Sequence, residues 1–260
     1  MPADNTVHIG VLLPDLLGTY GDRGNAVVLA QRLRWRGQPA EVVEVPAGSP
    51  IPDSCDAYVL GGGEDVAEDE AVRALRASPF PSAVERGAVV LAICAGMHVL
   101  GRWRADREGR RHEALGLLDL TTRPRQQRAT GELVARAVRE DLGIDQPLTG
   151  FENHGSATDL GPGMSPLARV VTGEGNGDGS EGVAAGNIIG TYMHGPVLAR
   201  NPGLADALLA RATGTALEPL PLPQVDELRT TTQELAQSGT PAMGRLRSLV
   251  TPGRWTQPGL

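Results

Sequence analysis

The sequence of 260 residues carries 24 lysine-plus-arginine and 31 acidic side chains, so its formal net charge at pH 7 is −7. This acidic balance and an aromatic content of only 3% argue against nucleic-acid binding, which uses basic surfaces and aromatic stacking platforms. All 24 of the basic residues are arginines, which excludes lysine Schiff-base chemistry and the phosphate-binding lysine of a P-loop.

Cysteine usage and the absence of long apolar runs narrow the class of protein further. Two cysteines, Cys55 and Cys94, form neither a disulfide framework nor a spacing typical of zinc ligands. The first ten residues do not resemble a signal peptide, and no apolar stretch approaches membrane-spanning length. We therefore expect a cytoplasmic protein with no membrane insertion and no metal site.

The first hundred residues alternate between strand and helix patterns. Apolar runs predict strands at residues 7–13, 41–45, 57–60 and 89–93, and helical spacing predicts helices at 25–36, 69–76 and 82–86. Such alternation is typical of an α/β fold with a mostly parallel sheet flanked by helices.

The pattern changes after residue 102. Residues 115–122 and 132–138 predict two strands of a small antiparallel section, and the Gly/Asp/Asn/Ser tract at 173–182 predicts an exposed hairpin or flexible loop. A strand at 187–193 and a helix at 204–211 follow. We expect one domain over residues 1–215 and a Pro/Gly-rich extension over 216–260, which holds one helix at 225–237 and then becomes loosely ordered.

The segment at 88–101, AVVLAICAGMHVLG, predicts a nucleophile elbow. A buried strand stops at Cys94, two small residues follow, and a short helix begins. The small neighbours allow a substrate carbonyl to approach, and the helix dipole favours a thiolate at this position. The alternative is an inert cysteine in the core, which is a common place for free cysteine.

A thiol in this position needs a base, and five histidines are available. His194 is the strongest candidate because it ends a predicted strand, where a side chain reaches the carboxyl edge of the sheet. His154, in the polar sequence FENHG, is the second candidate, and His98 is expected to face away from Cys94. A plain surface or hydrogen-bonded histidine is the alternative for each.

The glycine run that ends at Gly63 follows another predicted strand. A backbone N–H from this turn, together with that of Ala95, is suited to binding the oxyanion of a tetrahedral intermediate. The alternative is an ordinary strand-to-helix turn.

Three motifs carry a family resemblance: AICAGMHVLG after a strand, GGGED before it, and YMHGP a hundred residues later. They resemble class I glutamine amidotransferases of the cobyric acid synthase (CobB/CobQ-like) type, which implies a flavodoxin-like fold. The motifs DLLGTYGDRGN, GGGEDVAE and GFENHG are similar to the glutaminase subunits of lipid II isoglutaminyl synthases. The resemblance covers residues 7–211.

This resemblance implies that Cys94 attacks the side-chain amide of L-glutamine and that His194 transfers the protons. It also implies a set of substrate contacts, namely an oxyanion hole at Gly62, Gly63 and Ala95, and a glutamine-binding face at Arg128, Asn153, His154 and Gly155. A solvated surface charge is the alternative for Arg128.

The resemblance further implies a heterodimer with a Mur-ligase-like (MurT-like) synthetase subunit. Ammonia would pass to that partner, which would bind ATP and Mg²⁺ and amidate the D-glutamate α-carboxyl of the lipid II stem peptide. No cofactor is expected in this chain. The alternatives are an amidotransferase for another ATP-activated carboxylate such as a corrinoid side chain, a stand-alone hydrolase, and a non-catalytic binding subunit.

One departure from the wider class concerns the group that orients His194. Ordinary class I members carry a glutamate two residues after the histidine, whereas this chain has Pro196. We therefore expect either a carboxylate supplied by the partner or a simple Cys–His dyad, and with it weak glutaminase activity of the isolated chain.

Overall fold

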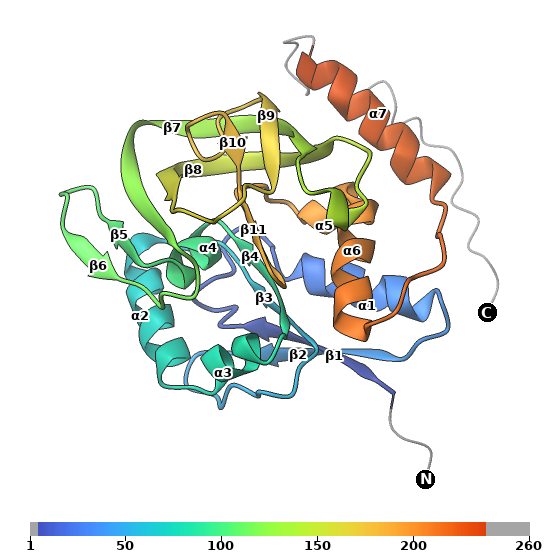
Figure 1. Ribbon diagram of the computed structural model, residues 1–260, viewed down its shortest axis with the longest axis horizontal. Helices are drawn as coiled ribbons and strands as arrows, with labels where there is room; N and C mark the ends of the chain where they lie inside the picture. Colours follow the sequence, from blue (N-terminus) through green and yellow to red (C-terminus); the bar gives the residue numbers. More distant parts are fainter. Residues whose placement is uncertain (1–4, 238–260) are drawn as a thin grey trace. The chain divides into compact units, whose positions relative to one another are not determined.

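The computed structural model describes residues 5–237 and is built around two sheets (Figure 1). The chain divides into two compact units, one ending at Pro221 and the other beginning at Leu222. The strands are β1 (Val7–Leu12), β2 (Ala40–Val45), β3 (Ala57–Leu60), β4 (Val89–Ile93), β5 (Trp103–Ala105), β6 (Arg111–Glu113), β7 (Leu120–Ala137), β8 (Leu148–Leu160), β9 (Ala168–Thr172), β10 (Ser180–Glu181), β11 (Val183–Ala185) and β12 (Ile188–Thr191). The helices are α1 (Gly24–Arg34), α2 (Asp65–Arg76), α3 (Phe80–Glu85), α4 (Ala95–Leu100), α5 (Val197–Arg200), α6 (Pro202–Thr213) and α7 (Pro223–Gln237), with a 3₁₀ turn at Glu140–Leu142.

The first sheet has the strand order β11-β12-β4-β3-β1-β2, and every pair except β11–β12 is parallel. Strands β3, β4 and β12 are buried at every residue, as expected where helices cover both faces of a parallel sheet. Helices α2, α3 and α4 lie on one face, and α1, α5 and α6 lie on the other (Figure 1). The predicted α/β fold with a mostly parallel sheet is confirmed.

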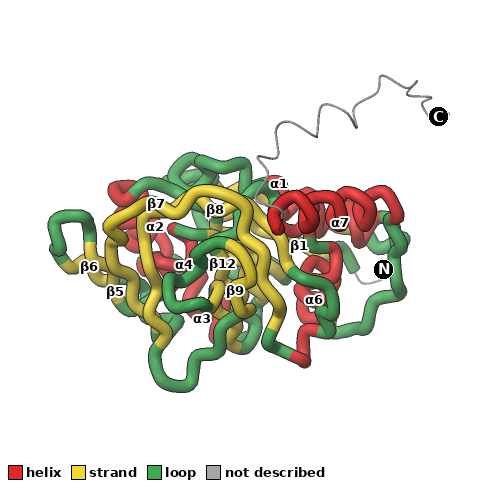
Figure 2. The backbone as a smooth tube through the Cα atoms, turned by 90° about the horizontal axis from the view of Figure 1, so that it is seen from above, coloured by secondary structure: helices red, strands yellow, loops and turns green. Residues whose placement is uncertain are grey.

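The second sheet has the order β10-β9-β7-β5-β6, and β8 pairs with β7 along most of its length (Figure 2). The prediction of separate strands at 115–122 and 132–138 is wrong, because one strand runs from Leu120 to Ala137. Its proline and its glycine resemble strand breakers. However, pairing with β8 continues past both residues, with a register shift between Pro124 and Ala129.

The Gly-rich tract at 173–182 connects β9 to β10, which pair antiparallel, so the predicted hairpin is present. Residues 173–174 and 177–179 are exposed, and Gly175 and Asn176 between them are buried. The backbone N–H groups of Glu174 and Gly175 donate to the carboxylate of Glu152, at 2.8 and 3.0 Å. Asn176 is 1% exposed, and its side chain bonds both backbone groups of Gly182. A buried carboxylate far along the chain therefore organises this tract.

Several predicted boundaries shift when the helices are seen in three dimensions. Helix α2 begins at Asp65, four residues earlier than predicted, and it carries acidic residues in its first turn, where the helix dipole favours them. The predicted helix at 225–237 is present as α7, which starts two residues earlier. The prediction of a loosely ordered tail after this helix lies outside the described residues.

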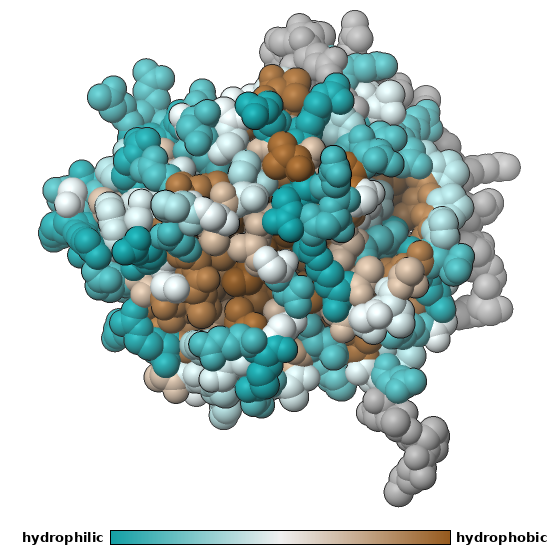
Figure 3. All heavy atoms as spheres, viewed as in Figure 1, coloured by the Kyte–Doolittle hydropathy of each residue, from teal (hydrophilic) through white to brown (hydrophobic). Residues whose placement is uncertain are grey.

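Hydrophilic side chains cover most of the face in Figure 3, and hydrophobic ones are visible in a hollow near its middle. Large apolar side chains that are exposed, such as Trp35 and Val66, are widely separated along the chain. No helix among residues 5–237 is long and apolar enough to cross a membrane.

Candidate active site at the carboxyl edge of the parallel sheet

Cys94 follows β4 directly and occupies a strained turn before α4. Its backbone has φ 52° and ψ −109°, and Leu13 is the one other non-glycine residue with positive φ in the described chain. The turn is held from both sides. The Cys94 N–H donates to the carbonyl of Thr191 at the end of β12, and the Gly96 N–H donates to Gly61. A Cβ on Gly96 would lie 2.6 Å from the carbonyl oxygen of Leu60, so only glycine permits this approach. The predicted elbow is therefore present.

Cys94 is buried, with 6% of the residue exposed, and the environment of its thiol favours the protonated form. Burial raises the pKa of this thiol well above its usual range, and the nearby carboxylate of Glu68 raises it further. The Ala95 N–H faces the sulfur and lowers the pKa, but by less. The expected effect of the helix terminus is thus present and is outweighed by desolvation, so the thiol requires a base.

His194 lies just past β12 and is paired with a carboxylate of this same chain. Its Nδ1 is 3.2 Å from Oδ2 of Asp22, and both side chains are almost completely buried. Within residues 5–237, Nε2 of His194 has no hydrogen-bond partner. This chain therefore places a carboxylate of its own beside His194, in contrast to the expected dyad with no acidic group. A carboxylate supplied by the partner, and weak activity of the isolated chain, stay predictions.

Sequence reasoning did not assign a role to Asp22, although the residue lies within a motif that it had singled out. Asp22 belongs to the loop between β1 and α1, at the carboxyl edge of the sheet, where the sites of open α/β folds form. This position in the loop was the feature of the sequence that could have indicated a role for Asp22 in the site. The 172-residue separation from His194 hid the pairing.

Two backbone N–H groups in the glycine turn after β3 differ in their hydrogen bonding. The Gly62 N–H donates to Oδ2 of Asp22 at 2.9 Å, so it is not available as the oxyanion donor that the sequence suggested. The Gly63 N–H has no hydrogen-bond partner in the described part of the chain, and Gly63 lines the same pocket as Cys94. Gly63 and Ala95 therefore remain as the two candidate donors.

Two further buried histidines lie near Cys94, and both are fully bonded. His98 lines the pocket with Cys94, which corrects the expectation that it faces away. Its Nδ1 is 3.1 Å from Glu68, and its Nε2 is 3.0 Å from the Tyr192 hydroxyl. His154, the second candidate base, stacks on the Tyr192 ring with centroids 3.8 Å apart.

Both ring nitrogens of His154 are also engaged. Nδ1 lies 2.8 Å from the carbonyl oxygen of Ser156, and Nε2 lies 3.2 Å from the carboxylate of Glu152. A histidine without a free nitrogen cannot accept a proton from the thiol unless it first loses a bond. Bonding therefore favours His194 over His98 and His154.

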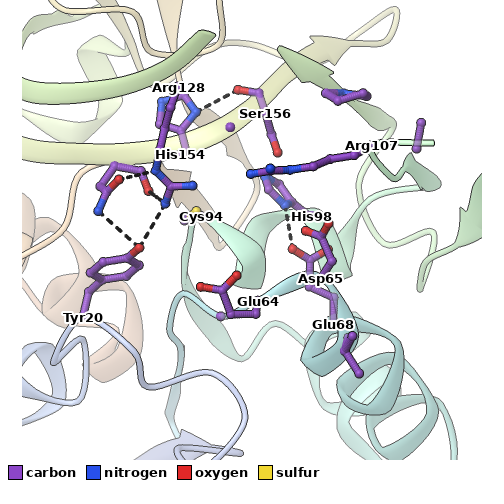
Figure 4. Close-up of a pocket in the computed structure, with 16 residues that line it drawn as sticks. Tyr20, Glu64, Asp65, Glu68, Cys94, His98, Arg107, Arg128, His154 and Ser156 are labelled. Atoms are coloured by element: carbon purple, nitrogen blue, oxygen red, sulfur yellow. Dashed lines mark hydrogen bonds and ion pairs between the residues drawn. The ribbon is translucent and has the colours of Figure 1, made fainter. Parts of the chain in front are cut away.

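The pocket beside Cys94 has a volume of about 350 Å³ and is lined by Arg128, Asn153, His154 and Gly155 from β7 and β8 (Figure 4). All four were expected to bind substrate. The guanidinium of Arg128 donates to the side chain and backbone oxygens of Asn153 and to the hydroxyl of Tyr20. Arg128 is exposed, yet these bonds hold it at the pocket, and its role in substrate binding stays a prediction. No cluster of three His, Cys, Asp or Glu side chains that could hold a metal is present in the described residues.

Comparison with known proteins agrees with this geometry. A model of the CobB/CobQ-like glutamine amidotransferase domain matches residues 8–202. The chain belongs to this family. It is therefore a glutamine amidotransferase, and the resemblance inferred from the three motifs is confirmed.

Curated relatives of this amidotransferase come from different systems. The subunit GatD of lipid II isoglutaminyl synthase (glutamine-hydrolyzing) from Staphylococcus aureus is 36% identical over 77% of this chain and 82% of the relative. The GatD subunit from Streptococcus pneumoniae is 33% identical over 79% and 80%. Cobyric acid synthase from Sphingopyxis alaskensis is 37% identical over 66% of this chain but only 34% of that enzyme.

Solved structures support the fold of this amidotransferase. A glutamine amidotransferase from Thermotoga maritima matches with a TM-score of 0.52 and 17% identity, over 94% of this chain and 96% of that one. A second glutamine amidotransferase matches with a TM-score of 0.51 and 21% identity, over 80% and 99%. The class I amidotransferase fold expected from the motifs is thus confirmed.

Proposed function

We propose that this chain is the glutaminase subunit of a lipid II isoglutaminyl synthase. Cys94 and His194 would release ammonia from L-glutamine for a Mur-ligase-like partner. The single observation that carries the chemistry is the state of His194, whose Nδ1 bonds to Asp22 while Nε2 has no hydrogen-bond partner in the described residues. The strand that leads to His194 is joined to the elbow by the bond from the Cys94 N–H to Thr191. The assignment to lipid II rests on the two GatD relatives, of which the chain covers about four fifths.

In the first half-reaction, Nε2 of His194 accepts the thiol proton as the sulfur of Cys94 attacks the amide carbon of glutamine. The carboxylate of Asp22 holds Nδ1 protonated and stabilises the imidazolium that forms. The imidazolium then donates its proton to the leaving nitrogen. Ammonia departs, and a γ-glutamyl thioester remains on Cys94.

In the second half-reaction, His194 accepts a proton from water as the water oxygen attacks the thioester carbonyl. Collapse of this intermediate breaks the carbon–sulfur bond, releases glutamate and returns the thiol. In both halves the N–H groups of Gly63 and Ala95 are the proposed donors to the oxyanion.

The partner is proposed to perform the ATP-dependent step. It would activate the α-carboxyl of D-glutamate in the lipid II stem peptide with ATP and Mg²⁺, and ammonia would then displace the activated oxygen. The absence of lysine from this chain is consistent with this division, because a P-loop lysine is the usual partner of a triphosphate. Because the two reactions would lie on separate chains, we propose that these chains form a heterodimer.

Ammonia release from L-glutamine tests this function directly, with the chain alone and with the Mur-ligase-like partner. Cys94→Ala is expected to lower release by at least about 10⁴-fold, because the nucleophile is lost. Cys55→Ala is the matched control, since Cys55 is the other buried free cysteine, and it should retain release.

Each outcome separates one alternative. Ammonia release that depends on Cys94 and rises when the partner is added supports the proposed glutaminase subunit. Equal release with and without the partner would indicate a stand-alone hydrolase. If the released ammonia amidates a corrinoid acid but not lipid II, the alternative of an amidotransferase for a corrinoid side chain is favoured. No release in any condition would leave a binding subunit.

A further inference from the structure

Arg107 is a pocket residue for which neither the motifs nor the proposed mechanism has a use. It lies in the turn between β5 and β6, and its side chain reaches into the pocket that holds Cys94 (Figure 4). It also lines the adjoining hollow of about 530 Å³, together with Arg125 and Arg128. Arg107 is exposed, and it presents a positive charge to both hollows, where a ligand of opposite charge could accept hydrogen bonds from it.

Arg107 and Arg128 converge on one point. A Cβ built on Gly155 would lie 3.9 Å from Nη2 of Arg107 and 4.0 Å from Nη1 of Arg128. Because Gly155 has no side chain, the space between the two guanidinium groups stays open. Two such groups facing a gap form a typical site for a carboxylate, which accepts hydrogen bonds from both.

Neither of these guanidinium groups is neutralised within the described chain. Arg128 bonds only to the neutral groups of Tyr20 and Asn153, and no hydrogen bond or ion pair to Arg107 is present among residues 5–237. By contrast, arginines nearby are paired with carboxylates, as Arg104–Glu68, Arg110–Asp106 and Arg125–Glu174 illustrate. The pair at Gly155 therefore keeps its positive charge for a ligand.

The pocket also carries charge of the opposite sign. Glu64 and Asp65, at the start of α2, line it, and no ion pair with either carboxylate is found in the part of the chain that the structure describes. An α-amino acid carries a carboxylate and an ammonium on the same carbon. A pocket with unpaired arginines and unpaired carboxylates is suited to bind both charges while the side chain extends to Cys94.

We infer that Arg107 is a specificity-determining residue that binds the α-carboxylate of glutamine together with Arg128. This inference rests on the proposed glutaminase function and adds a residue to its substrate site. In this assignment Arg107 contacts the α-carboxylate and not the reacting amide, so we expect it to affect the KM for glutamine. The thiol, the base and the oxyanion donors are unaffected.

Steady-state ammonia release by the full chain with its partner tests the assignment through Arg107→Gln. We expect the KM for L-glutamine to rise about tenfold or more, and kcat to stay within about twofold, because a charge-assisted bond to the ground state is lost. With L-glutamine α-amide, in which a neutral amide replaces the α-carboxylate, the same substitution should leave KM unchanged. Arg123→Gln is the matched control, because Arg123 is an exposed arginine of β7 paired with Asp159.

A second pair of variants tests the site from Gly155. Gly155→Asp would place a carboxylate between the two guanidinium groups and compete with the substrate, whereas Gly155→Asn has nearly the same shape without the charge. We expect the KM for glutamine to be several-fold higher in the Asp variant than in the Asn variant. This difference should disappear when each is combined with Arg107→Gln.

The outcomes separate the two proposals. If the wild-type protein releases no ammonia, the proposed function fails first. If it releases ammonia and Arg107→Gln leaves the KM for glutamine unchanged, or raises the KM for the α-amide equally, the assignment of Arg107 is overturned while the function stands.

Discussion

His194 bonds to a carboxylate through one ring nitrogen, whereas His98 and His154 each have hydrogen-bond partners on both ring nitrogens. All three rings are almost completely buried, so exposure does not distinguish them. The difference lies in the number of bonds that each ring makes. A carboxylate on one nitrogen orients a base and stabilises its cation, but partners on both nitrogens turn the ring into a structural bridge.

The bridging histidines belong to a connected polar network. Tyr192 accepts or donates a bond to His98, bonds Thr158 at 2.7 Å, and stacks against His154. Glu68 and Glu152 close the two ends of this network. The role of a buried histidine therefore depends on whether one of its ring nitrogens is left without a hydrogen-bond partner. The substitutions below test this rule.

The largest effect is expected at His194. His194→Gln removes the base, and kcat for ammonia release should fall by at least about 10⁴-fold. His98→Gln is the matched control, because His98 is also buried but has both ring nitrogens bonded, and its kcat should fall by less than about tenfold. Losses of equal size in the two variants would break the comparison, because both histidines would then act in the reaction.

Asp22→Asn is expected to have the next largest effect on kcat. The amide keeps the shape of the side chain but loses the charge that stabilises the imidazolium, so kcat should fall by about 10²- to 10⁴-fold. Asp206→Asn provides the control, since that carboxylate also joins two distant segments, through Arg32, but lies outside the pocket. A kcat for Asp22→Asn close to that of the wild type would show that the orienting group comes from elsewhere.

Gly62→Ala sharpens the comparison by moving His194 without changing any charge. A Cβ at this position would lie 2.8 Å from Cε1 of His194, so the ring must shift. A displacement of this kind should lower kcat by about 10²-fold while the melting temperature changes little. Gly203→Ala has open space around it and should leave kcat unchanged. An unchanged kcat for Gly62→Ala would mean that the position of the ring is not critical.

The smallest effect on activity is expected at Glu181, which holds the end of β12 just before His194. Burial raises the pKa of this carboxyl to about 7, even though Thr191 and the Tyr192 N–H donate to it. Between pH 4.5 and 7 the unfolded chain releases this proton and the folded chain keeps it. The free energy of unfolding should therefore fall across that window as pH rises.

Glu181→Gln has no proton to release, so its free energy of unfolding should lack this decline. The difference between the two proteins should grow by roughly 3 kcal/mol from pH 4.5 to 7 and then level off. Denaturant unfolding at several pH values measures it. Parallel pH curves for the two proteins would contradict the assignment.

Local patterns in the sequence were sufficient for the parts of the site that depend on one segment. The β-branched run of β4, the small residues after Cys94 and the position of His194 at a strand end are each visible in a few consecutive residues. The parallel sheet and the family followed from the same short patterns. These predictions succeeded because backbone preference and burial act over a few residues.

Only the tertiary structure decided which side chains meet. Asp22 pairs with His194, His98 with Tyr192, and Arg107 approaches Arg128, and none of these pairs shares a local pattern. The same holds for β7, whose course past Pro124 depends on pairing with β8. A contact between distant residues depends on how whole elements pack. Sequence therefore determined the elbow at Cys94 and the sheet, and packing determined which histidine pairs with a carboxylate through one nitrogen and keeps the other unbonded in the described residues.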